Sequence, residues 1–494
     1  MSSEKAVIIG AGAGGLALAI LLRRQGYAVT VFEKNSCAGG RVGRIENNGH
    51  IFDTGATLFL LPDFFRELFK DMGFVLEEEL ELTAVNPTSV VHFADGASLR
   101  LSSNMEIMRS QLQAYSPKAM SKYLALLHEG SESYRLAIPG FIKKNFYSAF
   151  DFFTLQNIFS LYKTRAWQTH FRRAAKYFRH PHLRAAFTYQ DIYVGLSPFT
   201  ASAVYSLFPY MELAGGLYFP RGGMYAIMQK LLAIGRQNGV EFFFNRPVSK
   251  ILIKDKKAAG VVCTDETSHA ASLVAANADL PYVYDKLLPA GKRQRRIKQK
   301  KYAAGALTFY FNVERCMNQL RHQHNVFLGS DYKRSFAAIF TDNYLADTPP
   351  FYLNLPARTH NDNAPPGKDT VMAVVPCGNI DPDRKTDWNK MRNQARSYIL
   401  KRLSQKAGFN VEQYISREQS FTPVDWQERC NVYRGAVFGS LAHTIRQVAW
   451  FRPANRHPDY KNLYFTGAST HPGAGVPMVL LSARLTAARI KAGK

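Results

Sequence analysis

The stretch AVIIGAGAGGLALAILL, residues 6–22, decides how this chain folds, because it reads either as a membrane span or as the start of a globular domain. It runs for seventeen residues without a charge, whereas a transmembrane helix needs about 20 mostly apolar residues. Four glycines lie at its centre, and a glycine cluster interrupts regular structure more readily than it spans lipid. We therefore predict a buried strand over residues 6–9, a tight turn, a helix over 14–25 and a second strand over 28–32.

The glycines of the predicted turn follow the spacing G-x-G-x-x-G at Gly10, Gly12 and Gly15, and Glu33 ends the second strand. A strand–turn–helix–strand unit with this spacing and a following acid binds dinucleotides. The first glycine permits the turn, the second lets the backbone approach a pyrophosphate, and the third lets helix and strand pack closely. The helix N-terminus attracts phosphate, and Glu33 is placed to accept hydrogen bonds from a ribose. The stretch is therefore predicted to be a dinucleotide site.

The chain is long, aromatic and strongly basic. Its 494 residues include 34 Phe and 25 Tyr and carry a formal net charge of +25. This length can bury a large core in two or three structural regions. The charge indicates an anionic partner, either nucleic acid or an acidic membrane surface. We expect the membrane surface and no nucleic acid, because no nucleic-acid-binding motif accompanies the charge.

Cysteine and histidine positions argue against metal sites and disulfides. The five cysteines are odd in number, are scattered, and form no C-x-x-C pair, so neither a zinc site nor a disulfide framework is indicated. His322 and His324 flank one glutamine without a third ligand nearby, so we expect no metal. No signal peptide precedes the first predicted strand, and we expect a cytoplasmic protein in a reducing compartment.

Two stretches concentrate the positive charge. GKRQRRIKQKK, residues 291–301, predicts a short basic helix, and an ordinary solvated helix face explains it equally well. Over residues 140–184 aromatic and basic residues alternate along one or two predicted amphipathic helices. Such a mixture suits a helix at a bilayer interface, although a helix packing its aromatic side on a core is the alternative. We expect this segment to bind anionic lipids peripherally, with cations at Lys143, Lys144, Arg172 and Arg173.

The carboxyl-terminal part of the chain contains a second predicted strand, glycine turn and helix. NLYFTGAS, residues 462–469, predicts a strand that enters a glycine turn, and GAGVPM, residues 473–478, opens a helix. Both chain ends would then build one cofactor site, with the middle of the chain inserted between them. We expect cofactor-binding segments at 1–85, 221–290 and 421–494, a helical substrate- and membrane-associating region at 86–220, and a substrate-binding region at 291–420.

Several motifs resemble those of a known family. Residues 10–41 resemble the extended motif of FAD enzymes of the glutathione-reductase-like and amine-oxidase type, and the Gly39-Gly40-Arg41 ending separates this group from simple NAD dehydrogenases. FDTGATLF at 52–59 and LYFTGASTHPGAGVPM at 463–478 narrow the resemblance to the bacterial carotenoid desaturases. These include phytoene, diapophytoene and hydroxycarotenoid desaturases, with related carotenoid oxidases and isomerases. The family often has Gly-Pro where this chain has Gly55-Ala56.

The resemblance implies an α/β fold in which a Rossmann-like FAD-binding domain of the glutathione-reductase type is built from both chain ends. It implies that the pyrophosphate and adenosine half of FAD would meet Gly10, Gly12, Ala13, Gly14, Gly15, Glu33, Gly40, Arg41 and Val248. It implies that the ribitol and the flavin ring would meet Gly55, Ala56, Thr57, Gly467, Val476, Pro477 and Met478. The last three would place N–H groups at the edge of the flavin that becomes negative on reduction.

The implied activity is desaturation of a carotenoid, in which the flavin takes a hydride and the adjacent carbon loses a proton. An apolar, aromatic tunnel would hold the polyene, and quinone or oxygen would accept the electrons. His471 and Asp191 are candidates to relay the proton, each weighed against a purely structural role. The alternatives are a carotenoid oxidase, a cis–trans isomerase, an amine or porphyrinogen oxidase, and a non-enzymatic FAD-bearing scaffold. Hydrolase, metalloprotease and Walker motifs are absent from the sequence.

Overall fold

The first strand lies in the middle of a parallel sheet at one end of the molecule. A computed structural model describes residues 4–493. Its five-stranded sheet has the order β19-β13-β1-β2-β9, and every neighbouring pair is parallel. The bounds are β1 Lys5–Ile9, β2 Ala28–Phe32, β9 Glu241–Phe243, β13 Leu273–Ala276 and β19 Leu463–Phe465. The predicted opening unit is confirmed, since helix α1 covers Ala13–Arg24 between β1 and β2.

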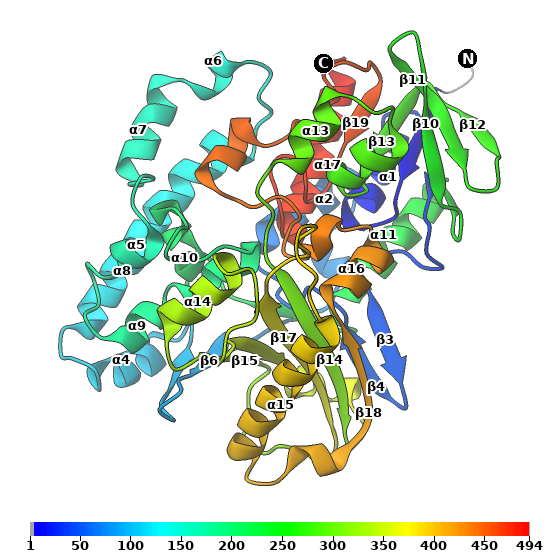
Figure 1. The fold of residues 1–494 in the computed structure, drawn as a ribbon. Coiled ribbons are helices and arrows are strands. Elements are labelled where there is room, and N and C mark those ends of the chain that lie inside the picture. Colours follow the sequence, from blue (N-terminus) through cyan, green and yellow to red (C-terminus); the bar gives the residue numbers. More distant parts are fainter. Residues whose placement is uncertain (1–3, 494) are drawn as a thin grey trace.

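Helices cover one face of this sheet and a small antiparallel sheet covers the other. Apolar side chains of the helices pack with β1 and β2 into one buried cluster, and the helices are α1, α2 Pro62–Met72, α11 Tyr225–Gln237 and α17 Val476–Lys491. Strands β10 Val248–Lys254, β11 Lys257–Cys263 and β12 Ser268–Ala270 cover the opposite face. Helix α17 lies beside α1 in Figure 1, so the two chain ends meet in this domain, as predicted.

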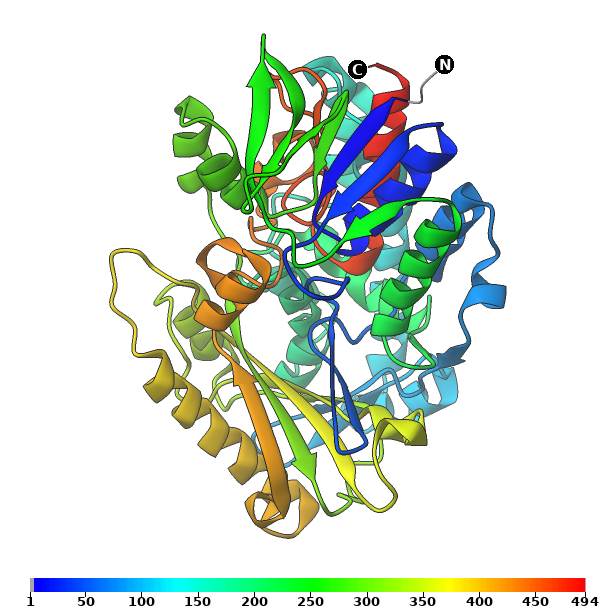
Figure 2. The same cartoon turned by 90° about the vertical axis from the view of Figure 1, so that its right-hand side faces the viewer.

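A second, seven-stranded sheet lies at the opposite end of the molecule (Figure 2). Its order is β18-β14-β17-β16-β15-β6-β7, and within the described chain only the β15–β6 pair is parallel. The bounds are β6 Ser89–His92, β7 Ser98–Leu101, β14 Gly305–Val313, β15 His324–Phe327, β16 Phe351–Asn354, β17 Asp369–Cys377 and β18 Ile415–Phe421. Helix α15, Trp388–Ala407, buries its apolar side against one face (Figure 1).

Short elements connect the two sheets. Two small antiparallel pairs link them, β3 Arg44–Asn47 with β4 His50–Asp53 and β5 Leu82–Ala84 with β8 Tyr218–Pro220. The remaining short helices outside the helical region described next are α3 Leu76–Glu79, α12 Leu280–Tyr282, α13 Lys292–Lys298, α14 Tyr332–Phe340 and α16 Pro423–Cys430. Helix α13 confirms the short basic helix that the sequence predicts.

The helical region between the sheets departs from the sequence prediction. One or two amphipathic helices over 140–184 were expected, and this was wrong, because the segment breaks into a π-helical turn and four short helices. Side-chain caps at Ser148, Thr154, Thr169 and His180 each start a new helix, so no long amphipathic face forms. The elements are α4 Met105–Gln113, α5 Ala119–Ala137, η1 Ile138–Ile142, α6 Ala149–Phe152, α7 Leu155–Lys163, α8 His170–Ala174, α9 Pro181–Ala186, η2 Tyr189–Val194 and α10 Leu207–Leu213.

Residues 4–493 contain no helix that is both long enough and apolar enough to cross a bilayer. The same residues contain no cluster of three or more His, Cys, Asp or Glu side chains arranged to hold a metal ion. All five cysteines are unpaired.

Gly15 is a position in the opening unit at which the fold leaves no room for a side chain. A Cβ atom built there would overlap the carbonyl oxygen of Gly10, a backbone atom that cannot rotate away. We expect Gly15→Ala to lower the free energy of unfolding by at least about 2 kcal/mol, because overpacking against backbone forces β1 and α1 apart. Gly291→Ala is the matched control, since Gly291 has an extended φ of −172° and open space around its Cα. Urea unfolding followed by circular dichroism measures both, and an equal loss in the two variants would contradict this account.

Candidate functional site

One long cavity of about 930 Å³ runs between the two sheets. At one end it is lined by the glycine turn after β1, in the middle by the N-terminus of α17, and at the other end by the seven-stranded sheet and the helical region. Parallel sheets bind ligands at the carboxyl ends of their strands, and this is where the first end of the cavity lies. A single cavity therefore joins a dinucleotide-type turn to an apolar chamber.

The dinucleotide end combines an uncapped helix N-terminus with a fixed acid. Helix α1 starts at Gly12, and no side chain caps its first N–H groups. Glu33 lies 6% exposed, and its two carboxylate oxygens accept hydrogen bonds from the backbone N–H of Ala11 at 2.8 Å and of Asn35 at 2.9 Å. The helix end suits a phosphate, and the oriented carboxylate suits ribose hydroxyls.

A second uncapped N-terminus points into the same cavity. Helix α17 starts after Gly475, whose φ of +101° favours glycine, and no side chain caps it. Val476, Pro477 and Met478 form the first turn and line the cavity, as does Gly467 after β19. Two helix dipoles therefore place positive potential along one wall, which favours a ligand with two separated electron-rich groups.

Most of the sequence-predicted site residues lie along this cavity. The lining includes Gly10, Gly12, Ala13, Glu33, Gly40, Arg41, Gly55, Ala56, Thr57, Val248, Gly467, Val476, Pro477 and Met478. The Nη1 atom of Arg41 donates to the carbonyl of Val437 at 2.9 Å, which holds the guanidinium at the wall. Gly14 and Gly15 do not line the cavity. Both serve the close packing of α1 behind the turn.

Asn277 explains why the turn needs so many glycines, and the sequence analysis missed it. Its side chain lies within 4 Å of where a Cβ would stand at Gly12, Gly14, Gly15 or Gly467. Its Nδ2 donates to the carbonyl of Gly10 at 3.3 Å. The available signal was its place just after the apolar run that forms β13, since ligands bind at the carboxyl ends of parallel strands.

The seven-stranded sheet supplies an apolar wall. Side chains alternate along β14 and β17, so that Leu307 and Phe309 pack in the core under α15 while Ala306 and Thr308 face the cavity. On β17 the cavity-facing residues are Met372, Val374 and Pro376.

A series of buried hydrogen bonds runs from this wall of the cavity into the sheet. The Thr57 Oγ1 and Tyr352 Oη atoms lie 2.8 Å apart, and Tyr352 Oη lies 2.6 Å from Nδ1 of His324. Burial lowers the pKa of His324 to about 3, so its imidazole is neutral at ordinary pH. These hydrogen bonds therefore link the predicted flavin-facing turn to an uncharged imidazole inside the sheet.

Two titratable groups line the middle of the cavity. Asp279 Oδ2 accepts hydrogen bonds from the Tyr433 N–H and the Ser440 Oγ, each at 2.9 Å, while desolvation raises its pKa. His443 Nε2 accepts from the Ala474 N–H at 3.0 Å, just before α17. Burial, reinforced by Arg452, lowers the pKa of His443 well below its usual range, so it remains a neutral acceptor.

The far end of the cavity opens among exposed apolar side chains. Phe153, Trp167, Ile445 and Phe451 all line the cavity, yet each keeps 43% or more of its surface exposed. Large apolar side chains gathered around one opening mark a place where an apolar ligand or surface is met. The mouth therefore suits a water-insoluble ligand.

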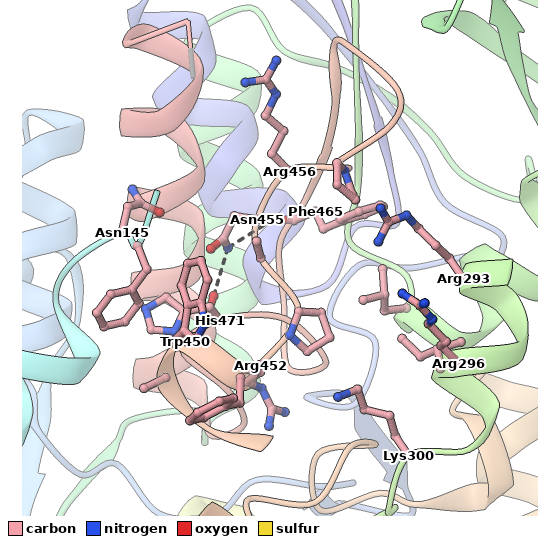
Figure 3. A pocket seen from close by; sticks show the side chains of 18 of the residues that line it. Asn145, Arg293, Arg296, Lys300, Trp450, Arg452, Asn455, Arg456, Phe465 and His471 are labelled. Atoms are coloured by element: carbon pink, nitrogen blue, oxygen red, sulfur yellow. Dashed lines mark hydrogen bonds between the residues drawn. The ribbon is translucent and has the colours of Figure 1, made fainter. Parts of the chain in front are cut away.

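The two candidate proton relays lie away from this cavity. His471 is 4% exposed, its Nε2 lies 3.0 Å from the carbonyl of Lys144, and burial lowers its pKa to about 4. Its ring lines a separate, smaller cavity (Figure 3). Asp191 is fully buried in η2, with both oxygens 3.0 Å from Nδ1 of His170. Burial raises the pKa of Asp191, and neither residue lines the long cavity.

Comparison with known proteins agrees with this geometry. Residues 13–491 match the family described as flavin containing amine oxidoreductase. The chain is 35% identical over 509 residues to the phytoene desaturase of Fusarium fujikuroi, with 99% of this chain and 89% of that protein covered. It is 37% identical over 489 residues to the zeta-carotene-forming phytoene desaturase of Myxococcus xanthus, with 99% and 94% covered. An oxidoreductase structure from Methanosarcina mazei has a TM-score of 0.66 at 19% identity, with 97% and 99% covered, and shows the shared fold alone.

The apolar chamber can be tested with a rod-shaped apolar dye. We expect diphenylhexatriene to fluoresce on entering the wild-type cavity, and Ala306→Phe to weaken its binding at least about tenfold, because a ring would fill the space that the dye needs. Thr308→Val, a change of similar volume on the same strand face, is the control. If Ala306→Phe binds the dye as the wild type does, the chamber does not extend along β14.

Proposed function

This chain belongs to the family of flavin-containing amine oxidoreductases, and we propose that it is a carotenoid desaturase that oxidises a long apolar polyene. The relatives confirm the resemblance found in the motifs, because they are named phytoene desaturases and align with almost the whole chain. The observation that carries the proposal is the continuity of the long cavity. A dinucleotide cradle and an apolar chamber share one space, as a reaction between a flavin and a hydrocarbon requires.

The cofactor is FAD, and the residues of the cavity fit it. Adding a Cβ at Gly12 would bring it 2.9 Å from Asn277 Nδ2, so the glycine leaves room for a close backbone approach to a pyrophosphate. Glu33 would hold the ribose, and Val248 the adenine. When bound, FAD supplies the hydride acceptor that no side chain provides.

The protein's own part is to orient the polyene and stabilise charge. The first turn of α17 offers N–H groups of Val476 and Met478 where negative charge develops on reduction. Thr57 fixes one wall through its hydrogen bond to Tyr352. We infer that the Thr57–Tyr352–His324 series of hydrogen bonds holds the Thr57 hydroxyl in place at the cavity wall, because a buried imidazole with a pKa of about 3 stays neutral and does not keep a proton. We assign His471 and Asp191 structural roles.

The substrate class follows from the chemistry of the chamber. Apolar and aromatic side chains line the end beyond α17, including Leu161, Tyr205, Phe208 and Met211. Among the described residues that line this end there is no Asp or Glu to pair with an amine, which favours a hydrocarbon over the amine and porphyrinogen alternatives. We propose phytoene or diapophytoene as substrate and quinone or oxygen as electron acceptor.

We propose further that the protein docks peripherally on the cytoplasmic surface of an anionic membrane, from which the polyene enters. Phe150 and Leu155 on α6 and α7 are 86% and 87% exposed, near the mouth of the cavity. The cations expected for docking contribute less. Lys143 pairs with Glu67, and Arg173 pairs with Glu129 through Nε at 2.7 Å. Two of the four expected cations are therefore paired with carboxylates, so we assign more of this contact to the exposed apolar side chains.

The test is an anaerobic mixture of FAD-loaded protein with liposomes that carry phytoene or diapophytoene. We expect the flavin absorbance near ~450 nm to bleach while the polyene spectrum moves to longer wavelength, since both partners of a hydride transfer report it. The faster of the two substrates identifies the carbon skeleton. If neither spectrum moves with either substrate, desaturation of these hydrocarbons is wrong, and the carotenoid oxidase and isomerase alternatives take its place.

A further inference from the structure

A second cavity has a volume of about 330 Å³, and the charged side chains that line it are all basic. It lies between helix α13 and the loop 449–456, with His471 and Asn145 at its inner side (Figure 3). Among the described residues that line it there is no Asp or Glu. Its basic residues are Arg293, Arg296, Lys300, Arg452, Arg456 and Arg489. Concave sites with one sign of charge concentrate ions of the opposite sign.

Three of these cations have an internal partner. Arg293 Nη2 donates to Asp459 Oδ1 at 2.9 Å. Arg452 is 3% exposed and donates only to backbone carbonyls, including that of Thr470 at 3.1 Å. Arg489 donates through Nη2 to the carbonyl of Phe146. Carbonyl oxygens accept hydrogen bonds from Arg452 and Arg489 without neutralising their charge.

The other three cations have no acceptor. Within residues 4–493, the side chains of Arg296, Lys300 and Arg456 make no hydrogen bond or ion pair. Arg296 lies on α13 and Lys300 follows that helix, while Arg456 lies in the loop between η10 and β19, and its guanidinium points away from the other two (Figure 3). The side chains of Arg296 and Lys300 can each donate to the oxygens of one phosphate.

A buried donor in the wall also lacks a partner. Arg489 is 6% exposed and its Nε makes no hydrogen bond. Burial together with the charge of Arg452 lowers the pKa of Lys300, as expected where positive charge is not compensated. An anion bound here would supply the missing acceptor and the missing charge.

This basic cavity adjoins the mouth of the long cavity. Ala449 and Phe451, in the turn η10 (Ala449–Phe451), line both cavities. The ring of Phe451 lies 5.6 Å from that of Phe152 on α6, centroid to centroid. In Figure 1 the orange turns that include η10 lie between α7 and α13. A lipid whose tails meet the apolar mouth would therefore have its head group beside the cations.

We propose that the basic cavity binds the phosphate head group of an anionic phospholipid and anchors the mouth of the long cavity to the membrane. The inference rests on the membrane docking proposed above and adds a defined head-group site to it. Charge excludes choline head groups, because the cations that line the cavity would repel a quaternary ammonium.

The test compares two triple variants with the same loss of charge, both as FAD-loaded full-length protein. The pocket variant carries Arg296→Gln, Lys300→Gln and Arg456→Gln. The control carries Lys385→Gln, Lys390→Gln and Lys401→Gln, exposed residues in or beside α15, at the other end of the molecule from α13 (Figure 1). Within residues 4–493 the side chains of all six residues make no hydrogen bond. Unchanged melting temperature and flavin content confirm that both variants fold.

In vesicle sedimentation with phosphatidylcholine and phosphatidylglycerol, we expect the pocket variant to bind at least about tenfold more weakly than the wild type, because three cations next to the lipid are lost. The control should bind within about twofold of the wild type, since its cations lie more than a Debye length from the surface. Equal weakening of both variants, or undiminished binding by the pocket variant, would overturn the proposal.

Calorimetry with monomeric dihexanoyl-phosphatidylglycerol and with inorganic phosphate separates a lipid site from a site for free phosphate. Tight binding of the short lipid, lost in the pocket variant, supports the proposal, and inorganic phosphate binding as tightly as the lipid overturns it. Phe150→Ser with Leu155→Ser tests docking separately. If that double variant keeps vesicle binding while the pocket variant loses it, the apolar docking surface is wrong and the head-group site stands.

Discussion

The close approach of the turn after β1 to the side chain of Asn277 is the contact on which the site depends. The amide of Asn277 donates to the Gly10 carbonyl and occupies the space where side chains at Gly12, Gly14 and Gly467 would stand. Glycine at these positions lets β1, β13 and β19 end within contact of one another. The first and last parts of the chain therefore meet at a single backbone junction, and the chain between them is free to build the rest of the cavity.

This junction sets the direction of two helices. Both α1 and α17 leave it with glycine N-caps and no capping side chain, so their N–H groups remain for a ligand. Thr57 and the first turn of α17 line the same cavity, so the cofactor end and the apolar chamber are parts of one space. Charge and apolar surface are thus kept at opposite ends of one space, as a reaction between a charged cofactor and a hydrocarbon demands.

Short sequence patterns predicted the structural units that are formed by neighbouring residues. The opening strand, turn, helix and strand, and the carboxyl-terminal turn into α17, follow from glycine spacing and apolar runs. Asn277 and Tyr352 were missed because their roles arise from contacts with residues far away in the chain, and a lone Asn or Tyr carries no such signal. The segment 140–184 was predicted as fewer, longer helices because periodicity was weighed above its capping residues. His471 lies within the flavin motif in the sequence, yet its ring lines the basic cavity. The sequence alone does not reveal which way this side chain points.

The most direct measurement is a crystal structure of the FAD-loaded protein with a fully conjugated polyene that cannot be desaturated further. The account predicts the isoalloxazine between Thr57 and the first turn of α17, with the polyene running from it past Tyr205 and Phe208 towards Leu161. A polyene bound on the outer surface, or in the basic cavity beside Arg296, would contradict the claim that one continuous cavity holds both reactants.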